Sequence, residues 1–297
     1  MSNSQMTILV TGGSGFLGQH LIPKLLKKYP AAIIKTLSRD GNAIQKLIVK
    51  CPDKRLIPIV GDIKDKSTVE YATQGVNIAI HLASLKHIDL CELYPIEAIE
   101  TNINGTRNLL DAFSGNTFIS MSTDKASEAT SCYGATKLII EKMVLEQAKK
   151  QKDRRYIIVR SGNLFGSTGS VIDRWKQQIK QHNMISITNL SMTRFFISAS
   201  SVAEHIISLI ENGLTECISI PNQKALKLSD LAKTTIELWG NKNTDINIIG
   251  ARAGEKEHES LYSVGEKIVP NTAYRLSSEA PMWTLDEIKQ ELENIVK

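Results

Sequence analysis

The stretch Thr11-Gly12-Gly13-Ser14-Gly15-Phe16-Leu17-Gly18 decides the fold, because it separates an apolar strand-like run from a helical pattern. Residues 7–11 predict a buried strand and residues 16–29 predict a helix. Glycines at these spacings permit a tight turn, a close approach of the backbone to a pyrophosphate, and close packing of helix on sheet. The free N–H groups at the helix N-terminus then face the phosphates. We therefore predict a dinucleotide-binding loop formed by Gly12, Ser14, Gly15, Phe16, Leu17 and Gly18.

The strand–helix rhythm continues through the first half of the chain. Further strands are predicted at 33–37, 56–60, 76–82, 117–121 and 156–159, and further helices at 64–73, 95–113 and 133–150. Repeated units of this kind predict an α/β fold with a doubly wound parallel sheet of the Rossmann type. We place a dinucleotide-binding domain at 1–165 and a smaller substrate lobe at 166–297, with some of the later chain returning to the first domain.

Beyond residue 165 the pattern changes to glycine-rich loops and isolated helices. Helices are predicted at 201–212, 229–239 and 285–296. The last of these opens with Thr284, followed three residues later by Glu287, which is the spacing of a capping box. No Pro/Gly/Ser-rich linker separates the halves, so we expect two lobes in firm contact.

Composition narrows the class of protein. The 297 residues are 42% hydrophobic and 23% charged, with a net charge of +5, which is typical of a soluble globular protein. The chain has no apolar run long enough for a spanning helix and no signal-peptide pattern, so we expect a cytoplasmic protein without a membrane partner. The mild, dispersed charge does not favour nucleic-acid binding. The four cysteines lack metal-ligand spacing, and no metal is expected.

The identity of the dinucleotide depends on the end of the second strand. An acid there would bind the ribose 2′-hydroxyl of NAD, but the sequence has Ser38 followed by Arg39. A serine and a guanidinium suit a 2′-phosphate, which favours NADP. Asp40 keeps NAD open, since a shift of one residue restores the acid. Asp62 and Ile63, after the third strand, are expected to contact the adenine, although a plain turn remains the alternative.

A second motif points to catalysis. Tyr133 and Lys137 are four residues apart and so share one helix face, where a cation favours the phenolate. Alone, this pair could be two surface residues. Together with the glycine loop and with Ser122 and Thr123 ten residues upstream, it resembles the triad of the extended short-chain dehydrogenase/reductases.

Several further segments sharpen this resemblance. They are His81-Leu82-Ala83-Ser84-Leu85-Lys86-His87, Thr101-Asn102, Ser122-Thr123-Asp124-Lys125, Met192-Thr193-Arg194-Phe195 and Arg252-Ala253-Gly254-Glu255-Lys256-Glu257-His258-Glu259. In combination, the chain resembles the soluble, inverting UDP-N-acetylglucosamine 4,6-dehydratases of the polysaccharide-biosynthesis and pseudaminic acid pathway family. That resemblance implies C4 oxidation, loss of water across C5 and C6, and return of hydride to C6.

The resemblance also implies roles for individual residues. Tyr133, assisted by Lys137, takes the proton of the 4-hydroxyl, and Thr123 hydrogen-bonds that hydroxyl. Asp124 is the acid for the departing 6-hydroxyl and Lys125 is the C5 base, provided that its pKa is depressed; a phosphate or ring-hydroxyl contact is the alternative for Lys125. The cofactor site gains Leu82, Ala83, Ser84 and Lys86. The substrate site gains Lys86, His87, Asn163, Ser170, Val171, Arg194, Arg252, Glu255 and His258.

Other functions remain open from the sequence. A nucleotide-sugar 4-epimerase needs no acid/base pair at C5 and C6, so Asp124 and Lys125 argue against it. A dehydratase that stops at a 5,6-ene is not separated from one that returns hydride. An NADP-sensing regulator on the same fold would typically lose Tyr133 or Lys137. The resemblance further suggests a homo-oligomer of at least two subunits, built on the Tyr133 helix and its neighbour.

Overall fold

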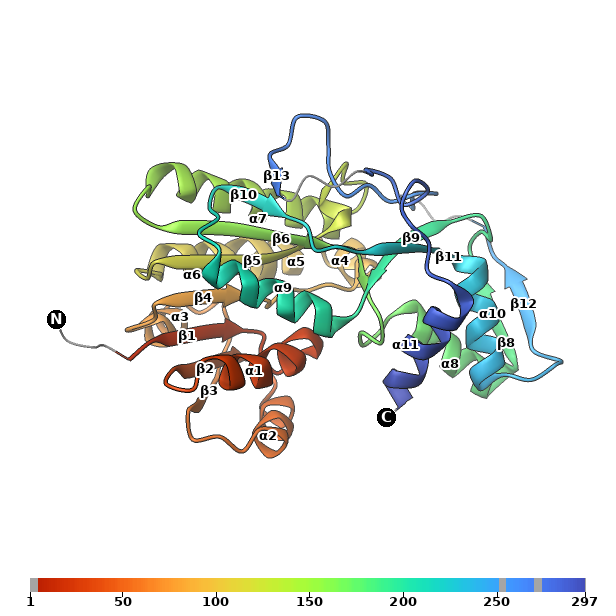
Figure 1. Ribbon diagram of the computed structural model, residues 1–297, viewed down its shortest axis with the longest axis horizontal. Coiled ribbons are helices and arrows are strands. Elements are labelled where there is room, and N and C mark those ends of the chain that lie inside the picture. The colour runs from red at the N-terminus through yellow and green to blue at the C-terminus, as the bar shows by residue number, and fades with distance from the viewer. Residues whose placement is uncertain (1–4, 251–254, 270–273, 297) are drawn as a thin grey trace.

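A parallel sheet of eight strands carries the site. The computed structural model describes residues 5–250, 255–269 and 274–296, and within them the strands lie in the order β13-β10-β6-β5-β4-β1-β2-β3 (Figure 1). Their bounds are β1 (Thr7–Thr11), β2 (Ile33–Ser38), β3 (Leu56–Val60), β4 (Ile78–His81), β5 (Thr117–Thr123), β6 (Arg155–Ser161), β10 (Cys217–Ser219) and β13 (Ile268–Val269). All neighbouring strands pair in parallel, and the predicted α/β doubly wound fold is confirmed.

The strand order reverses direction at β1. The chain proceeds from β1 to β2 and β3 on one side and then crosses to β4 on the other side of β1. In open α/β sheets, ligands bind at the carboxyl edge beside such a switch point. Here that edge is formed by the loops after β1, β4 and β5.

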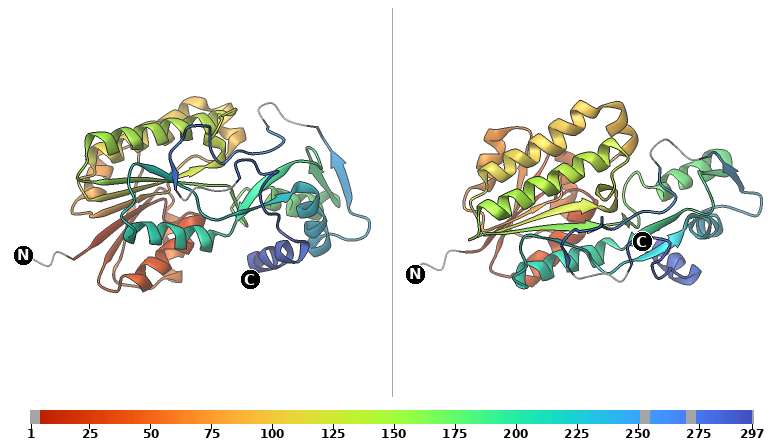
Figure 2. Two further views of the ribbon diagram at one scale, coloured as in Figure 1. Left: turned by 45° about the horizontal axis from the view of Figure 1, so that its top comes forward. Right: turned by 90° about the horizontal axis from the view of Figure 1, so that it is seen from above.

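Helices cover both faces of the sheet, as Figure 2 shows. One face carries α1 (Phe16–Lys28) and α9 (Ala199–Glu211), whose leucines and isoleucines form one apolar core with β1 and β2. The other face carries α3 (Lys66–Thr73), α6 (Gly105–Ala112) and α7 (Cys132–Lys150) over a second core. Because strands buried on both faces must be apolar throughout, β1 and β4 show no alternation of burial.

A smaller lobe lies at one end of this sheet (Figure 1). It contains α8 (Val171–His182), α10 (Leu228–Trp239) and α11 (Leu285–Val296) around a core that includes Trp175, Phe196 and Leu231. Its strands form the sheet β11-β9-β7 and the pair β12-β8; their bounds are β7 (Asn163–Leu164), β8 (Met184–Ile187), β9 (Thr193–Ile197), β11 (Lys224–Lys227) and β12 (Asp245–Ile248). Between β9 and β11 the chain returns to the large sheet as α9 and β10.

The helices differ in places from the sequence prediction. The predicted helix 95–113 is divided into α5 (Pro95–Ala98), a π-helical stretch η1 (Ile99–Asn104) and α6. The helices α2 (Gly41–Lys50) and α4 (Ile88–Leu93) were not predicted. The capping box is confirmed, since Thr284 N donates to Glu287 Oε2 at 2.9 Å and Glu287 N donates to Thr284 Oγ1 at 3.2 Å.

Candidate active site

The glycine loop has the shape that a dinucleotide requires. Gly12 has φ of +71°, and a Cβ there would approach Ala83 N to 2.8 Å. A Cβ on Gly18 would come within 2.3 Å of the Gly13 carbonyl oxygen, so only glycine lets α1 begin against this turn. The helix starts after Gly15 without a side-chain cap and without an acid in its first turn. Its N-terminal N–H groups are therefore suited to phosphate, and the residues present fit a dinucleotide.

The end of β2 carries Ser38 and, two residues later, the acid Asp40. Ser38 is buried and its hydroxyl accepts a hydrogen bond from Ser14 N at 3.2 Å, which ties β2 to the glycine loop. Asp40 caps α2, accepting from Asn42 N and Ala43 N at 2.9 and 3.1 Å. The Asp40 carboxylate is thus engaged in its own helix.

Beside it, the Arg39 side chain is 54% exposed, and its Nη1 lies 3.9 Å from Asp62 Oδ2. Asp62 also accepts a hydrogen bond from Lys64 N, while Ile63 is buried under α6. Ser38, Arg39 and Asp62 therefore lie at the same edge of the sheet, and Ile63 packs behind them.

Asn102 holds the turn after β4. Its Oδ1 accepts from Leu85 N at 2.7 Å and from the Ser84 hydroxyl at 3.0 Å, and its Nδ2 donates to Leu85 O at 3.0 Å. The same Nδ2 donates to Thr136 Oγ1 on α7 at 3.0 Å. Asn102 is fully buried in the π-helical stretch, so this irregular turn fixes residues 82–85 against the Tyr133 helix.

Helix α7 places Tyr133 against the end of β5. A Cβ on Gly134 would lie 2.3 Å from Lys125 O, so the glycine between Tyr133 and Lys137 lets the first turn of α7 pack directly on that backbone. The Tyr133 phenol consequently lies close enough to the Thr123 hydroxyl for that hydroxyl to influence its pKa. Lys137 is buried and donates from Nζ to Met121 O at 2.6 Å. The predicted dyad therefore stands at the carboxyl edge of β5.

The pKa of Tyr133 differs from the sequence prediction, in which a nearby cation favours the phenolate. Burial raises the pKa of Tyr133 to about 12, although the charge of Lys125 and the nearby Thr123 hydroxyl act in the lowering direction. The cation that favours the phenolate is thus Lys125 rather than Lys137. Burial also lowers the pKa of Lys137 to about 8, against the opposing effect of Glu141. In the free protein Tyr133 is a neutral phenol at pH 7.

Thr123, Asp124 and Lys125 form a compact group in the 3₁₀ turn after β5. Thr123 Oγ1 donates to Asp124 Oδ1 at 2.9 Å, and Lys125 Nζ donates to the same oxygen at 3.0 Å. Asp124 is fully buried, and its other oxygen, Oδ2, has no hydrogen-bond partner among the described residues. Burial raises the pKa of Asp124, with Lys125 opposing this shift. This fits the predicted acid.

Lys125 does not meet the condition set for a lysine base. Its ammonium lies 3.0 Å from Asp124 Oδ1, 3.6 Å from Glu259 Oε1 and 3.4 Å from Asn163 Oδ1. Burial would lower the pKa of Lys125, but the two carboxylates outweigh it and raise the pKa above its ordinary value. Lys125 is therefore an ammonium in the free protein, and the expected depression of its pKa is wrong.

Glu259 is a site residue that the sequence analysis did not single out. Its buried carboxylate lies 3.6 Å from Lys125 Nζ and 3.8 Å from Arg194 Nε. Arg194 in turn lies 3.4 Å from Glu255 Oε1. Charges thus alternate from Asp124 through Lys125, Glu259 and Arg194 to Glu255. Only the tertiary contact between the two lobes reveals Glu259, because no local spacing in the sequence relates it to Lys125.

Two of the predicted substrate residues already have partners within the chain. Arg194 donates to the carbonyl oxygens of Thr193 and Glu257 at 2.8 and 3.0 Å and is buried, so it braces its own segment. His258 Nδ1 lies 2.8 Å from Thr193 Oγ1 and is a tie between β9 and the returning chain. Arg252 lies outside the described residues.

Loops from the two lobes meet near the remaining predicted substrate residues. Lys86 Nζ donates to Thr168 O at 2.8 Å, and a Cβ on Gly169 would come within 2.5 Å of the His87 ring. Ser170 caps α8 by accepting from Asp173 N, and Val171 begins that helix. The structure therefore brings Lys86 and His87 close to the start of α8, while Asn163 joins the Lys125 group through its Oδ1.

A buried cluster of charged side chains lies next to the Tyr133–Lys137 dyad. Arg160 is fully buried and donates to Glu141 at 3.0 and 2.5 Å and to Glu266 at 2.7 and 3.0 Å. Glu141 lies one turn after Lys137 on α7 and accepts from the Ser122 hydroxyl. The cluster therefore joins α7, β6 and the chain that carries Glu259.

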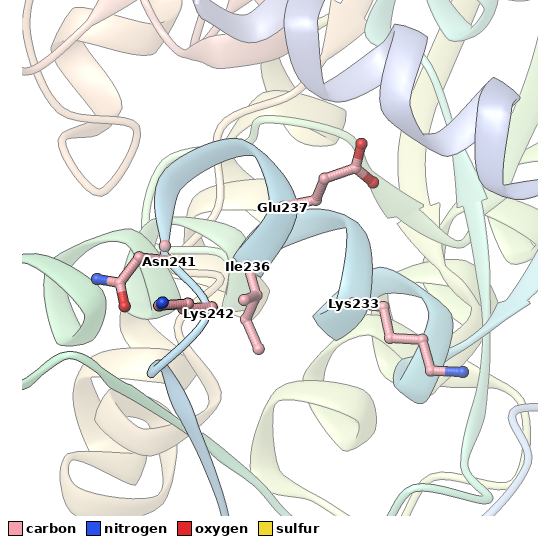
Figure 3. A pocket seen from close by; sticks show the side chains of 6 residues that line it. Lys233, Ile236, Glu237, Asn241 and Lys242 are labelled. Atoms are coloured by element: carbon pink, nitrogen blue, oxygen red, sulfur yellow. The ribbon is translucent and has the colours of Figure 1, made fainter.

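One surface hollow lies far from these groups in the fold. It has a volume of about 410 Å³ at the end of α10 and is lined by Lys233, Ile236, Glu237, Gly240, Asn241 and Lys242 (Figure 3). None of the predicted site residues lines it. Among the described residues, no group of three or more His, Cys, Asp or Glu could hold a metal ion, and no helix is long and apolar enough to cross a membrane.

The sheet order, the glycine loop and the Tyr133–Lys137 dyad define an extended short-chain dehydrogenase/reductase fold. A family model described as "Polysaccharide biosynthesis protein" matches residues 8–278, and the chain belongs to that family.

The proteins to which this chain is similar include epimerases, a dehydratase and an uncharacterized membrane protein. The chain is 34% identical to a UDP-glucose 4-epimerase of Rickettsia rickettsii, over 88% of this chain and 78% of that one. It is also 34% identical to an uncharacterized membrane protein of Methanocaldococcus jannaschii, over 86% of this chain and 80% of that one. The structure of DesIV, a dTDP-glucose 4,6-dehydratase of Streptomyces venezuelae with NAD bound, has a TM-score of 0.79, 22% identity, and coverage of 97% and 96%.

Proposed function

We propose that the protein is an NADP-dependent UDP-N-acetylglucosamine 4,6-dehydratase of the cytoplasm, with inversion at C5. The observation that carries this proposal is Asp124 beside the Tyr133–Lys137 dyad. Asp124 is a fully buried acid with one unpaired oxygen, and it sits one residue after the hydroxyl that Tyr133 contacts. An enzyme that only oxidises and reduces C4 has no use for such an acid.

The residues divide the chemistry among them. A bound dinucleotide supplies reversible hydride storage, and Gly12, Ser14, Gly15, Ser38 and Arg39 are the groups that would hold it. Thr123 orients the sugar 4-hydroxyl, and Tyr133 accepts its proton as a phenolate, a form that the neighbouring Lys125 ammonium favours. Lys137 fixes the end of β5 through Met121 O. Asp124 protonates the departing 6-hydroxyl, and Lys125 holds the acid in place as an ammonium.

The direct test is product analysis after incubation with UDP-N-acetylglucosamine in D₂O. Mass spectrometry should show the loss of one water, and NMR should show a 4-keto-6-deoxy sugar with deuterium at C5. The proton couplings then report the configuration at C5. An isobaric product with a changed C4 configuration would contradict the proposal.

A 4-epimerase is the second candidate, and the name of the Rickettsia relative favours it. An epimerase would form a product of unchanged mass with the opposite configuration at C4 and without deuterium at C5. A dehydratase that stops at the 5,6-ene would also lose water but would form a product without the 6-methyl group. An NADP-sensing regulator would leave the sugar unchanged.

The cofactor preference is a testable part of the proposal. Because Asp40 caps α2 and Ser38 faces the loop, the exposed guanidinium of Arg39 is the group that we expect to bind the 2′-phosphate. We expect Arg39→Gln to weaken NADP binding about tenfold, the loss of roughly one charge-assisted hydrogen bond, and to leave NAD binding unchanged. Titration by fluorescence measures both, with Arg107→Gln on exposed α6 as the control. Tighter binding of NAD than NADP by the native protein would reverse the assignment.

We also propose a homodimer formed through the helices beside Tyr133. Five large apolar side chains on α4, α5 and α7 and the turn between them are 42–69% exposed, which favours a contact: Leu90, Leu93, Tyr94, Ile96 and Ile139. Sedimentation should give a dimer for the native protein and a monomer for Ile96→Glu. Val264→Glu, at a side chain that is 92% exposed in the loop before β13, should remain dimeric. A monomeric native protein would refute the proposal.

A further inference from the structure

We propose that Glu259 is the base that removes the C5 proton, working opposite Asp124 across the shared ammonium of Lys125. This inference rests on the proposed dehydratase function and assigns a catalytic residue within it. It gives the substrate lobe a chemical role, because Glu259 belongs to the chain that returns from that lobe.

The backbone around Glu259 is firmly held. Glu259 N donates to Ser277 Oγ and Ser277 N donates to Glu259 O, both at 2.9 Å. The preceding residue, His258, is bridged to Thr193 of β9. With its backbone fixed on both sides, Glu259 directs its carboxylate at Lys125 and Arg194. A fixed backbone keeps the carboxylate in one position, which a general base needs in order to meet the proton that it removes.

Asp124 and Glu259 share Lys125 but have opposite surroundings. Glu259 lies between two cations, whereas Asp124 has one cation and a buried oxygen without a donor among the described residues. Paired cations stabilise a carboxylate, and an unpaired buried oxygen favours the protonated acid. Burial accordingly raises the pKa of Asp124. Although burial acts against it, the charges of Lys125 and Arg194 lower the pKa of Glu259.

When the surroundings of two neighbouring carboxyl groups shift their pKa values in opposite directions, the group with the raised pKa is the acid and the group with the lowered pKa is the base. The titratable groups that face Glu259 are Asp124 and Lys125 from the turn after β5, Arg194 from β9, and Lys256 from its own segment. Three of these four groups are cations. Lys125 has acceptors on three sides and holds its proton, so it cannot take another.

The elimination step balances with these two residues. The C5–H bond breaks, its proton goes to Glu259, and its electron pair forms the C5–C6 double bond beside the 4-ketone. The C6–O bond breaks at the same time, and the hydroxyl leaves as water with the proton of Asp124. When the C6 hydride has been added, C5 takes up a solvent-derived proton on the face opposite Glu259, which inverts C5, and Glu259 releases its own proton to solvent. The proton that Tyr133 took from the 4-hydroxyl restores Asp124.

The test follows the C5 proton separately from hydride transfer. The 4-keto-6-deoxy sugar that keeps the C5 configuration of the substrate is incubated with protein in D₂O, so that its C5 proton lies on the face from which Glu259 would remove it, and NMR measures the exchange of that proton. We expect Glu259→Gln to slow this exchange at least 100-fold, the scale of general base catalysis. Glu257→Gln is the matched control: it is exposed two residues earlier, its side chain bonds Ser191, and exchange should stay within twofold. Exchange by Glu259→Gln at the native rate would overturn the inference.

The native protein supplies a second test that needs no variant. A carboxylate base with a lowered pKa predicts an exchange rate that is constant from pH 9 to about pH 6, whereas a lysine base predicts about a tenfold rise with each pH unit. Lys125→Met should keep measurable exchange and shift its acidic limb to higher pH, because Glu259 loses one cation. A native rate that climbs through this range, or complete loss of exchange at every pH in Lys125→Met, would assign the base to Lys125 instead. If the native protein forms no 4-keto product at all, the proposed function fails first.

Discussion

Replacing Tyr133 with phenylalanine should lower kcat by about 1,000-fold, within the usual range for a general acid–base group. The phenol is the group that Thr123 contacts at the carboxyl edge of β5, and phenylalanine keeps its shape without the hydroxyl. Since the ring still fills its place, KM for the nucleotide sugar and dinucleotide affinity should change less than threefold. Steady-state kinetics and cofactor titration measure these quantities.

The control for this variant is Tyr71→Phe, on an exposed face of α3, where the side chain is 63% exposed. It should leave both kcat and KM at native values. A Tyr133→Phe protein that is folded and retains kcat within tenfold of the native enzyme would show that another group takes the 4-hydroxyl proton.

Replacing Asp124 with asparagine should reduce the rate of water loss by about 100- to 10,000-fold. The amide has nearly the same shape as the protonated acid but cannot donate a proton to a leaving hydroxyl. Oxidation at C4 should persist, because Tyr133 and Lys137 are untouched. Exchange of the C5 proton in a 4-keto-6-deoxy sugar with the substrate configuration at C5 should also persist, because it needs the base alone. Mass spectrometry and NMR on the same samples separate these steps.

Asp111→Asn supplies a matched control, since Asp111 is exposed on α6 and pairs only loosely with Arg107 at 3.7 Å. The melting temperature of Asp124→Asn establishes that the buried cluster still folds. Native rates of dehydration in that variant would place the acid elsewhere.

The large sheet could be predicted because the sequence patterns that specify its strands and helices are local. Apolar runs alternate with helical patterns, Gly12 supplies a backbone with φ of +71°, and Gly18 meets a steric limit set by Gly13 five residues earlier. The Tyr133–Lys137 pair is equally local, since residues four apart share a helix face. The helix predicted at 95–113 was wrong in detail because Asn102 is needed to hold Leu85, a contact that periodicity does not encode.

By itself the sequence determined the doubly wound fold, the dinucleotide loop, and the positions of Tyr133, Lys137, Thr123 and Asp124 on one edge of it. Only the tertiary structure decided the charge of Lys125 and the involvement of Glu259. A pKa depends on the charges and the water within a few ångströms of the group, and for Lys125 these include Glu259, Asn163 and, beyond Glu259, Arg194, which come from later parts of the chain. The spacing of residues along a chain carries no record of such neighbours.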